Sequence, residues 1–183
     1  MACRKVEVLK DFGADVRVIA PEMIPKIREI ENITLIEREL MPSDLSEVKL
    51  VVAATDDPAC NSRISKMCKE RGISVNAVDQ IDDCSFIFPS YLRSGGVVAA
   101  FSSGGDSPAV TQYLKEKNRP FMTKQLGELA ECLGGLRDEV KSSIASKADR
   151  KKVYLELLEL GLEREEPLSQ EEIEAVIRRY KGE

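Results

Sequence analysis

Three segments of the chain end in side chains that could bind a ligand or move a proton. Residues 50–57 (LVVAATDD) end in one threonine and two aspartates, residues 74–90 carry Asp79 directly after an apolar run, and residues 97–108 end in SSGGDSP. Each segment has the pattern of a strand followed by small, polar or acidic residues. Because ligands of parallel α/β sheets bind at the carboxyl ends of the strands, we predict that the three ends line one crevice.

The residue types that are absent narrow the chemistry. The 183-residue chain contains no histidine, which excludes Ser-His-Asp and Cys-His catalysis and any His-ligated metal site. Proton transfer must therefore use Asp, Glu, Lys, Tyr, Cys or water. The five cysteines are scattered and never stand in CxxC spacing, a pattern typical of structural thiols in a reducing cytoplasm.

Charge and hydropathy limit the partners. The formal net charge of −5 disfavours nucleic acid as the main partner. No apolar run approaches the roughly 20 residues that cross a bilayer, and the first residues contain no apolar signal segment. These features predict a cytoplasmic protein with neither nucleic acid nor membrane as a partner.

Helical and strand patterns alternate through the first part of the chain. Helices are predicted over residues 2–12, 25–31 and 58–71, and strands over 15–20, 33–39, 50–54 and 73–78. This alternation predicts an α/β fold with a Rossmann-like parallel sheet. We expect a dinucleotide-binding domain over residues 1–88.

The pattern changes after residue 85. Two strands joined by a turn at residues 94–96 are predicted, followed by a helix that Ser107 caps and that runs to about Lys117. The remainder is helical, with a capping box at Ser169 before a last helix that ends near Tyr180. We therefore expect a small β-hairpin and helix region for dimerisation over residues 89–120 and a helical C-terminal domain over residues 121–183.

The chain begins inside a helix, without a strand or Gly-rich turn before it. Dinucleotide-binding units carry both, because phosphate sits at the amino end of that helix. We therefore predict a Rossmann-like sheet whose first, central strand is missing, so that two strands lack a shared partner. The alternative is a different fold that starts with a helix.

Six short motifs together resemble one enzyme family. They are AxRKV at residues 2–6, VxVIAPE at 16–22, AATDD at 53–57, NxVD at 76–79, SFIFPS at 85–90 and SSGGxSP at 102–108. Over residues 2 to about 152 the chain resembles the precorrin-2 dehydrogenase family, which includes the amino-terminal module of siroheme synthase. That family oxidises precorrin-2 to sirohydrochlorin with NAD, and some members insert Fe(II) as well. The family's GGG turn is absent here, which implies weak NAD binding by this chain.

The resemblance implies roles for residues in the first domain. Asp79 matches the family's essential aspartate and would act as the base, although a loop-capping aspartate is the alternative. Glu22 would contact NAD together with Pro21, and its charge favours NAD over NADP; a simple turn is the alternative. The segment after residue 53 would line the nicotinamide, while Asp57 would cap the following helix. The cofactor-binding set is Pro21, Glu22, Ala54, Thr55, Asp56, Asn76 and Val78.

The Gly-rich turn at residues 102–108 leads into the amino end of a helix. Free backbone N–H groups there would form an anion site suited to the carboxylates of precorrin-2, and an ordinary turn with an N-cap is the alternative. Ser103 matches a serine that is phosphorylated in siroheme synthase. The substrate-binding set is Ser102, Ser103, Gly104, Gly105, Ser107 and Arg93.

The resemblance also implies a homodimer, and the apolar residues of this region would be core or dimer contacts. Two further predictions each have an alternative. Asp82 and Asp83 are expected to be solvated, or else to help hold Fe(II) as a substrate. A nucleotide-sensing regulatory module and an inactive tetrapyrrole-binding protein are the alternative functions; the former would not need the NxVD and SSGGxSP motifs.

Overall fold

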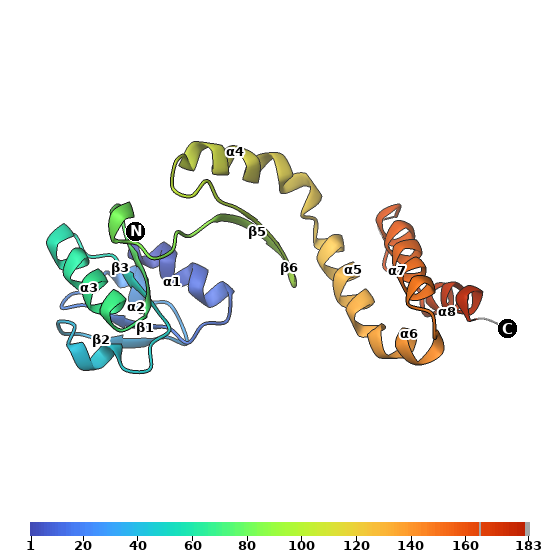
Figure 1. The fold of residues 1–183 in the computed structure, drawn as a ribbon, viewed down its shortest axis with the longest axis horizontal. Coiled ribbons are helices and arrows are strands. Elements are labelled where there is room, and N and C mark those ends of the chain that lie inside the picture. Colours follow the sequence, from blue (N-terminus) through green and yellow to red (C-terminus); the bar gives the residue numbers. More distant parts are fainter. Residues whose placement is uncertain (165, 182–183) are drawn as a thin grey trace. The chain divides into compact units, whose positions relative to one another are not determined.

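The computed structural model describes residues 1–164 and 166–181, which separate into an α/β unit, Met1–Phe88, and a second unit that begins at Pro89 (Figure 1). Glu165 and residues 182–183, which fall in the predicted C-terminal helical domain, lie outside the described residues. None of the described helices is long and apolar enough to cross a membrane.

Helices and strands alternate through the α/β unit, as the sequence predicts. Its elements are α1 (Ala2–Asp11), β1 (Arg17–Ile19), α2 (Pro25–Arg28), β2 (Thr34–Ile36), η1 (Pro42–Leu45), β3 (Leu50–Ala53), α3 (Pro58–Glu70), β4 (Ser74–Ala77) and η2 (Ile81–Asp83). The start of α3 shows the local cause: the Asp57 carboxylate accepts a hydrogen bond of 2.9 Å from the Ala59 N–H, and Pro58 occupies the first turn. The predicted cap is confirmed.

The four strands form two parallel pairs rather than one continuous sheet. Strand β1 pairs with β2, and β3 pairs with β4 in a register that places Ala53 opposite Ala77. Within the described residues β1 and β3 share no partner strand, as predicted. Strand β3 is a continuous apolar run and yet is only partly buried, since Leu50, Val51 and Val52 remain half-buried. The reason is that β3 has a neighbouring strand along one edge alone in the part of the chain described.

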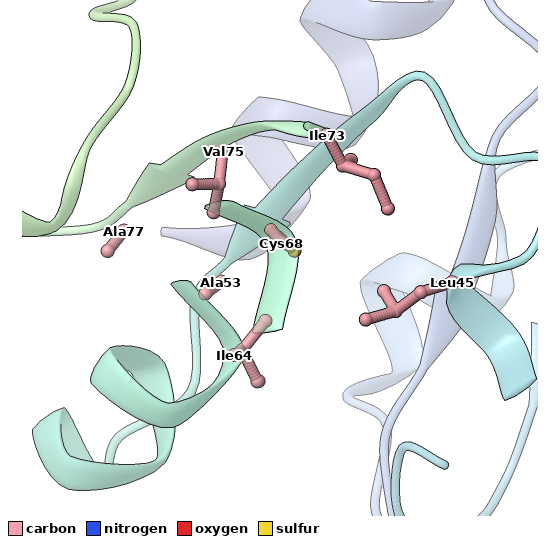
Figure 2. Close-up of a cluster of buried hydrophobic side chains, with 7 residues drawn as sticks. All are labelled: Leu45, Ala53, Ile64, Cys68, Ile73, Val75 and Ala77. Carbon is pink, nitrogen blue, oxygen red and sulfur yellow. The ribbon is translucent and has the colours of Figure 1, made fainter. Parts of the chain in front are cut away.

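Each strand pair packs on its own hydrophobic cluster. The cluster under β3 and β4 is made with α3 and η1 and contains Leu45, Ala53, Ile64, Cys68, Ile73, Val75 and Ala77 (Figure 2). A smaller cluster under β1 and β2 contains Cys3, Met23 and Ile27. The burial of these apolar side chains holds the carboxyl ends of the strands in fixed positions.

The second unit opens with the predicted hairpin. Strands β5 (Ser90–Ser94) and β6 (Val97–Phe101) are antiparallel, and the turn between them needs Gly95, whose φ is 55°. Helix α4 (Pro108–Asn118) follows and packs on both strands. The Ser107 hydroxyl accepts a hydrogen bond of 3.3 Å from the Val110 N–H, which confirms the predicted cap.

The rest of the second unit is helical, as predicted. After η3 (Arg119–Phe121) come α5 (Lys124–Gly135), α6 (Arg137–Ser143), α7 (Lys147–Leu162) and α8 (Gln170–Tyr180). The helices enclose a third cluster, whose buried members are Val140, Ile144, Val153, Leu157, Ile173, Val176 and Ile177.

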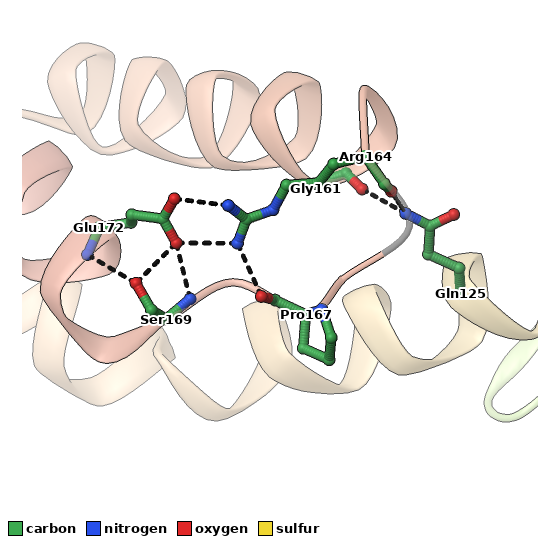
Figure 3. A network of polar contacts seen from close by, with 6 residues as sticks. All are labelled: Gln125, Gly161, Arg164, Pro167, Ser169 and Glu172. Atoms are coloured by element: carbon green, nitrogen blue, oxygen red, sulfur yellow. Dashed lines mark hydrogen bonds and ion pairs between the residues drawn. The ribbon is translucent and has the colours of Figure 1, made fainter.

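A polar network precedes α8 (Figure 3). Ser169 and Glu172 form the predicted capping box: the Glu172 N–H donates to the Ser169 hydroxyl at 3.4 Å, and the Ser169 N–H donates to the Glu172 carboxylate at 2.8 Å. The Arg164 guanidinium donates to both carboxylate oxygens of Glu172. Arg164 and Ser169 together lower the pKa of Glu172 to about 2.

This network predicts an acid-labile contribution to stability. The folded-state pKa of Glu172 lies below its ordinary value of 4.5, so the contribution is fully present above pH 4.5 and is lost as the pH falls toward about 2. We expect Glu172→Gln to lower the thermal unfolding midpoint at neutral pH. The difference from the unsubstituted protein should vanish in acid.

Thermal unfolding followed by circular dichroism checks this expectation. Glu171→Gln is the matched control, because Glu171 is an exposed acidic neighbour in the same helical turn. The control should change the midpoint little at any pH. A Glu172→Gln deficit that stays constant from neutral pH into acid contradicts the account.

Candidate cofactor and catalytic site

Asp79 stands two residues after the end of β4 in an uncommon backbone conformation. Its φ is 60°, in the left-handed region that non-glycine residues seldom adopt. The neighbouring backbone is held by hydrogen bonds from the Val78 N–H to the Ala53 carbonyl at 2.9 Å and from the Gln80 N–H to the Ala77 carbonyl at 3.3 Å. The Asp79 residue is exposed. Backbone strain of this kind clusters at functional sites, so the conformation motivates a functional hypothesis for this carboxylate.

Lys5 of α1 interacts electrostatically with Asp79. The Lys5 ammonium lies 4.1 Å from the centre of the Phe88 ring. Burial, and then the charge of Arg4, lower the pKa of Lys5, while Cys84 and Asp79 act in the opposite direction. No role was predicted for Lys5 from the sequence. Its position inside the AxRKV motif could have indicated one.

The loop after β3 is fixed by a buried asparagine. The Asn61 amide oxygen accepts from the Thr55 N–H at 3.0 Å and from the Thr55 hydroxyl at 2.8 Å, and the Asn61 NH₂ donates to the Thr55 carbonyl at 3.1 Å. Asn61 is 2% exposed, whereas Thr55 and Asp56 are exposed and Ala54 is half-buried. The hydrogen bonds from Asn61 therefore fix a loop in which Thr55 and Asp56 are exposed to solvent.

Asn61 was not predicted as a functional residue, although the sequence contains a pattern that indicates its role. Asn61 stands at helical spacing with Ile64, Ser65 and Cys68, and all four are buried on one face of α3. An amide at an otherwise buried position must hydrogen-bond to something nearby. The nearest candidate is the loop just before the helix.

We expect Asn61→Leu to destabilise the α/β unit by about 1–3 kcal/mol, because the Thr55 N–H and hydroxyl lose their shared acceptor inside the fold. Urea unfolding measures the loss. Lys66→Leu, an exposed position on the same helix, is the control and should shift the free energy of unfolding by less than about 0.5 kcal/mol. Equal losses in the two variants contradict the assigned role.

Two further polar residues, Asn76 of β4 and Asp83 of η2, have internal partners. Asn76 is 7% exposed, and its NH₂ donates to the Phe86 carbonyl at 3.2 Å and to the Cys84 sulfur at 3.3 Å. The expectation that Asp83 is solvated is wrong: its carboxylate accepts from the Ser62 hydroxyl at 2.5 Å and from the Gln80 NH₂ at 3.1 Å. Both side chains hold the segment that follows Asp79.

The candidate metal ligands do not gather into a binding site in the part of the chain that the structure describes. Asp82 is exposed, as expected. Across residues 1–164 and 166–181, no group of three or more His, Cys, Asp or Glu side chains lies close enough together to hold a metal ion. All five cysteines are free thiols.

The other residues of the predicted cofactor set lie at strand ends of the same unit. Pro21 and Glu22 are exposed in a bend just after β1, and Val78 is half-buried just after β4. An exposed carboxylate and small residues at strand ends fit the ribose and the nicotinamide side of a dinucleotide. The described residues of the α/β unit contain no Gly-rich turn before a helix that would fit the pyrophosphate.

The predicted substrate set lies in the second unit, on the turn between β6 and α4 and on β5. The expectation of free N–H groups in this turn is wrong for four of them. Internal acceptors already engage the N–H groups of Gly104, Asp106, Ser107 and Val110. Ser103 accepts from the Ser107 N–H at 2.9 Å and donates to the Ser107 carbonyl at 3.2 Å. Because these N–H groups already donate to acceptors within the turn, an anion that binds here must compete with the internal hydrogen bonds.

Arg93 also has a partner in the hairpin. Its Nε donates to the Gly95 carbonyl at 2.8 Å, and the residue is exposed. The two glycines of the turn have φ values of 67° for Gly104 and 100° for Gly105, which require glycine.

Comparisons with known proteins now bear on this arrangement. Residues 1–90 match a family described as putative NAD(P)-binding. The siroheme synthase of Sodalis glossinidius is 36% identical over 157 residues, which are 84% of this chain and 33% of that protein. The siroheme synthase of Ectopseudomonas mendocina is 40% identical over 144 residues, or 77% of this chain and 31% of that protein.

A solved structure entitled SirC, precorrin-2 dehydrogenase, has a TM-score of 0.71 at 22% identity. The alignment covers 98% of this chain and 88% of that one. This likeness confirms the predicted fold class. The chain spans about a third of the length of the curated siroheme synthases it matches. Over that third the chain is similar to the siroheme synthases, and its first 90 residues match the family of putative NAD(P)-binding domains.

Proposed function

We propose that this chain catalyses the NAD-dependent oxidation of precorrin-2 to sirohydrochlorin, a step of siroheme biosynthesis. The observation that carries the proposal is Asp79, an exposed carboxylate held at a φ of 60° at the carboxyl end of β4. The loop after β3 lies alongside, because β3 and β4 are parallel and Ala53 stands opposite Ala77. The names of the matching siroheme synthases support the same reaction.

Asp79 takes the proton in this reaction. NAD, when bound by the strand-end residues, would supply the hydride acceptor, and the substrate must also release a proton to complete the oxidation. The Asp79 carboxylate accepts that proton as a general base. Lys5 supplies a countercharge near the carboxylate.

Residues at the strand ends hold the cofactor. Glu22, beside Pro21, binds the ribose hydroxyls, and its charge repels a 2′-phosphate, which favours NAD over NADP. Ala54, Thr55 and Asp56 line the nicotinamide side on the support that Asn61 provides. Val78 contributes to the cofactor site because it precedes Asp79 in the chain. Asn76 contributes because its side-chain amide hydrogen-bonds to the Phe86 carbonyl and so fixes the segment after Asp79.

The second unit binds the substrate and a second copy of the chain. Ser102, Ser103, Gly104, Gly105, Ser107 and Arg93 contact the carboxylates of the tetrapyrrole. The exposed apolar side chains of β6 and α4 support a homodimer interface: Val98 is 42% exposed, Val110 51% and Tyr113 61%. In this view residues 1–88 bind NAD, residues 89–120 dimerise, and residues 121–183 form the helical C-terminal domain. We place the enzyme in the cytoplasm, where free thiols stay reduced.

Anaerobic incubation with precorrin-2 and NAD tests the proposal. The chain is assayed as it stands and in a form extended before Met1 by a strand and a Gly-rich turn of the kind that dinucleotide-binding units carry. The sirohydrochlorin absorption spectrum and NADH are expected in at least one form. No conversion in either form contradicts the proposal. Adding Fe(II) to the same reaction reports whether sirohydrochlorin is also a substrate for metal insertion.

A further inference from the structure

A groove in the second unit combines positive charge with apolar surface. It lies between α7 and the segment formed by the end of α5 and α6, and its volume is about 550 Å³. That volume falls in the range of small-molecule sites. The proposed dehydrogenase chemistry assigns it no role.

Both walls of the groove follow helical spacing. On one wall, Leu133, Arg137 and Lys141 recur every four residues. On α7, Lys147 and Lys151 are followed by Tyr154 and Leu158 on the same face of the helix. The first turns of α7 therefore supply charge, and its later turns supply apolar surface.

The groove cations lack the acidic partners that neighbouring cations have. Lys152 pairs with Asp149 at 2.7 Å, and Arg179 pairs with Glu156 at 2.6 Å. No ion pair links any groove cation to an acidic group in residues 1–164 and 166–181; these cations are Arg137, Lys141, Lys147, Arg150 and Lys151. In a chain of net charge −5, this local concentration of unneutralised positive charge favours an anionic occupant.

The apolar part of the groove favours an organic anion over an inorganic one. Tyr154 and Leu158 are half-buried, and Leu155 is 47% exposed, so an inorganic anion would leave this surface uncovered. A second copy of the same groove would bring like charges together, which is unfavourable. The complementary ligand has an apolar body and several anionic groups.

We infer that this groove is a binding site for a polycarboxylated tetrapyrrole. The inference rests on the proposed function for the identity of the ligand, since precorrin-2 and sirohydrochlorin have this chemistry. The apolar ring system packs on Tyr154, Leu155 and Leu158, and its carboxylates pair with the cations of α6 and the first turns of α7. The groove shares no lining residue with the set proposed for the reaction, so it is a second site for this class of ligand.

Fluorescence titration with uroporphyrin, a stable polycarboxylated tetrapyrrole, tests the inference. The full chain is compared with the double variant Lys147→Glu/Lys151→Glu. Arg178→Glu/Lys181→Glu is the matched control, because it makes the same change of net charge at exposed positions outside the groove. Circular dichroism verifies that both variants are folded.

The groove variant should bind uroporphyrin about tenfold or more weakly, and the control should stay within about twofold of the unsubstituted chain. Benzenehexacarboxylate, which has carboxylates but little apolar surface, should compete poorly. Equal weakening in both variants, no weakening in either, or equally strong competition by benzenehexacarboxylate overturns the inference. Groove-dependent binding without turnover of precorrin-2 would contradict the proposed function alone, and turnover without groove-dependent binding would contradict the groove alone.

Discussion

Replacing Asp79 by asparagine is expected to lower kcat by about 10²–10⁴-fold, the usual contribution of a positioned general base. Asparagine tolerates the left-handed backbone region, so the φ of 60° at this position can be retained while the proton acceptor is lost. NAD affinity should stay within about twofold, because the assigned cofactor contacts lie on other residues. Stopped-flow kinetics and calorimetry under anaerobic conditions measure the two quantities.

Asp82→Asn is the control for this prediction. Asp82 is an exposed aspartate three residues along the chain, and the loss of its charge should leave kcat within about twofold. If Asp79→Asn turns over at the normal rate, the assignment of the base is wrong. If both variants lose activity equally, the effect belongs to the charge of the loop and not to proton transfer.

Leu157→Ala is expected to cost about 2–5 kcal/mol of stability in the second unit, because it leaves a cavity in a closed core. Leu157 is 0% exposed and packs among the buried residues of α6, α7 and α8. Leu162→Ala on the same helix is the matched control, since Leu162 is 52% exposed and its truncation should cost less than about 0.5 kcal/mol. Urea unfolding followed by circular dichroism measures both losses.

The location of the loss is a second part of this prediction. Leu157 belongs to the unit that begins at Pro89, so tryptic cleavage within residues 89–164 should rise in Leu157→Ala before cleavage within residues 1–88. Equal costs for the two leucine variants would contradict the assignment of Leu157 to the core.

Features with a local cause were predictable from the sequence. The alternation of elements in the α/β unit, the hairpin at Gly95, and the caps at Asp57, Ser107 and Ser169 all follow from residues a few positions apart. The separation of β1 from β3 was predicted on another ground, namely that none of the strands read from the sequence pairs with both.

The hydrogen-bond partners of individual polar groups were not predictable from the sequence. Asp83 looked like a solvated loop charge, yet Ser62, 21 residues earlier in the chain, donates to it. The Gly-rich turn looked like a set of free donors, yet Ser103 closes it onto Ser107. Composition and spacing give the chemical types of these groups, but three-dimensional packing decides their partners.

The groove illustrates the same limit. The sequence contains Arg137 and Lys141 at one helical spacing and Lys147 and Lys151 at another, and each pair alone is typical of a solvated helix face. That the two rows line one cavity depends on how α6 and α7 pack through Val140 and Val153. A sequence pattern on one helix cannot contain that information.

The most direct test of the account is to follow NADH and sirohydrochlorin simultaneously in an anaerobic reaction with precorrin-2, NAD and the better-folded of the two forms described above. The account predicts that both products appear together in equal amounts and that Asp79→Asn slows the appearance of both by about 10²–10⁴-fold while the enzyme still binds NAD. Precorrin-2 left unchanged, or sirohydrochlorin formed without NADH, would contradict it.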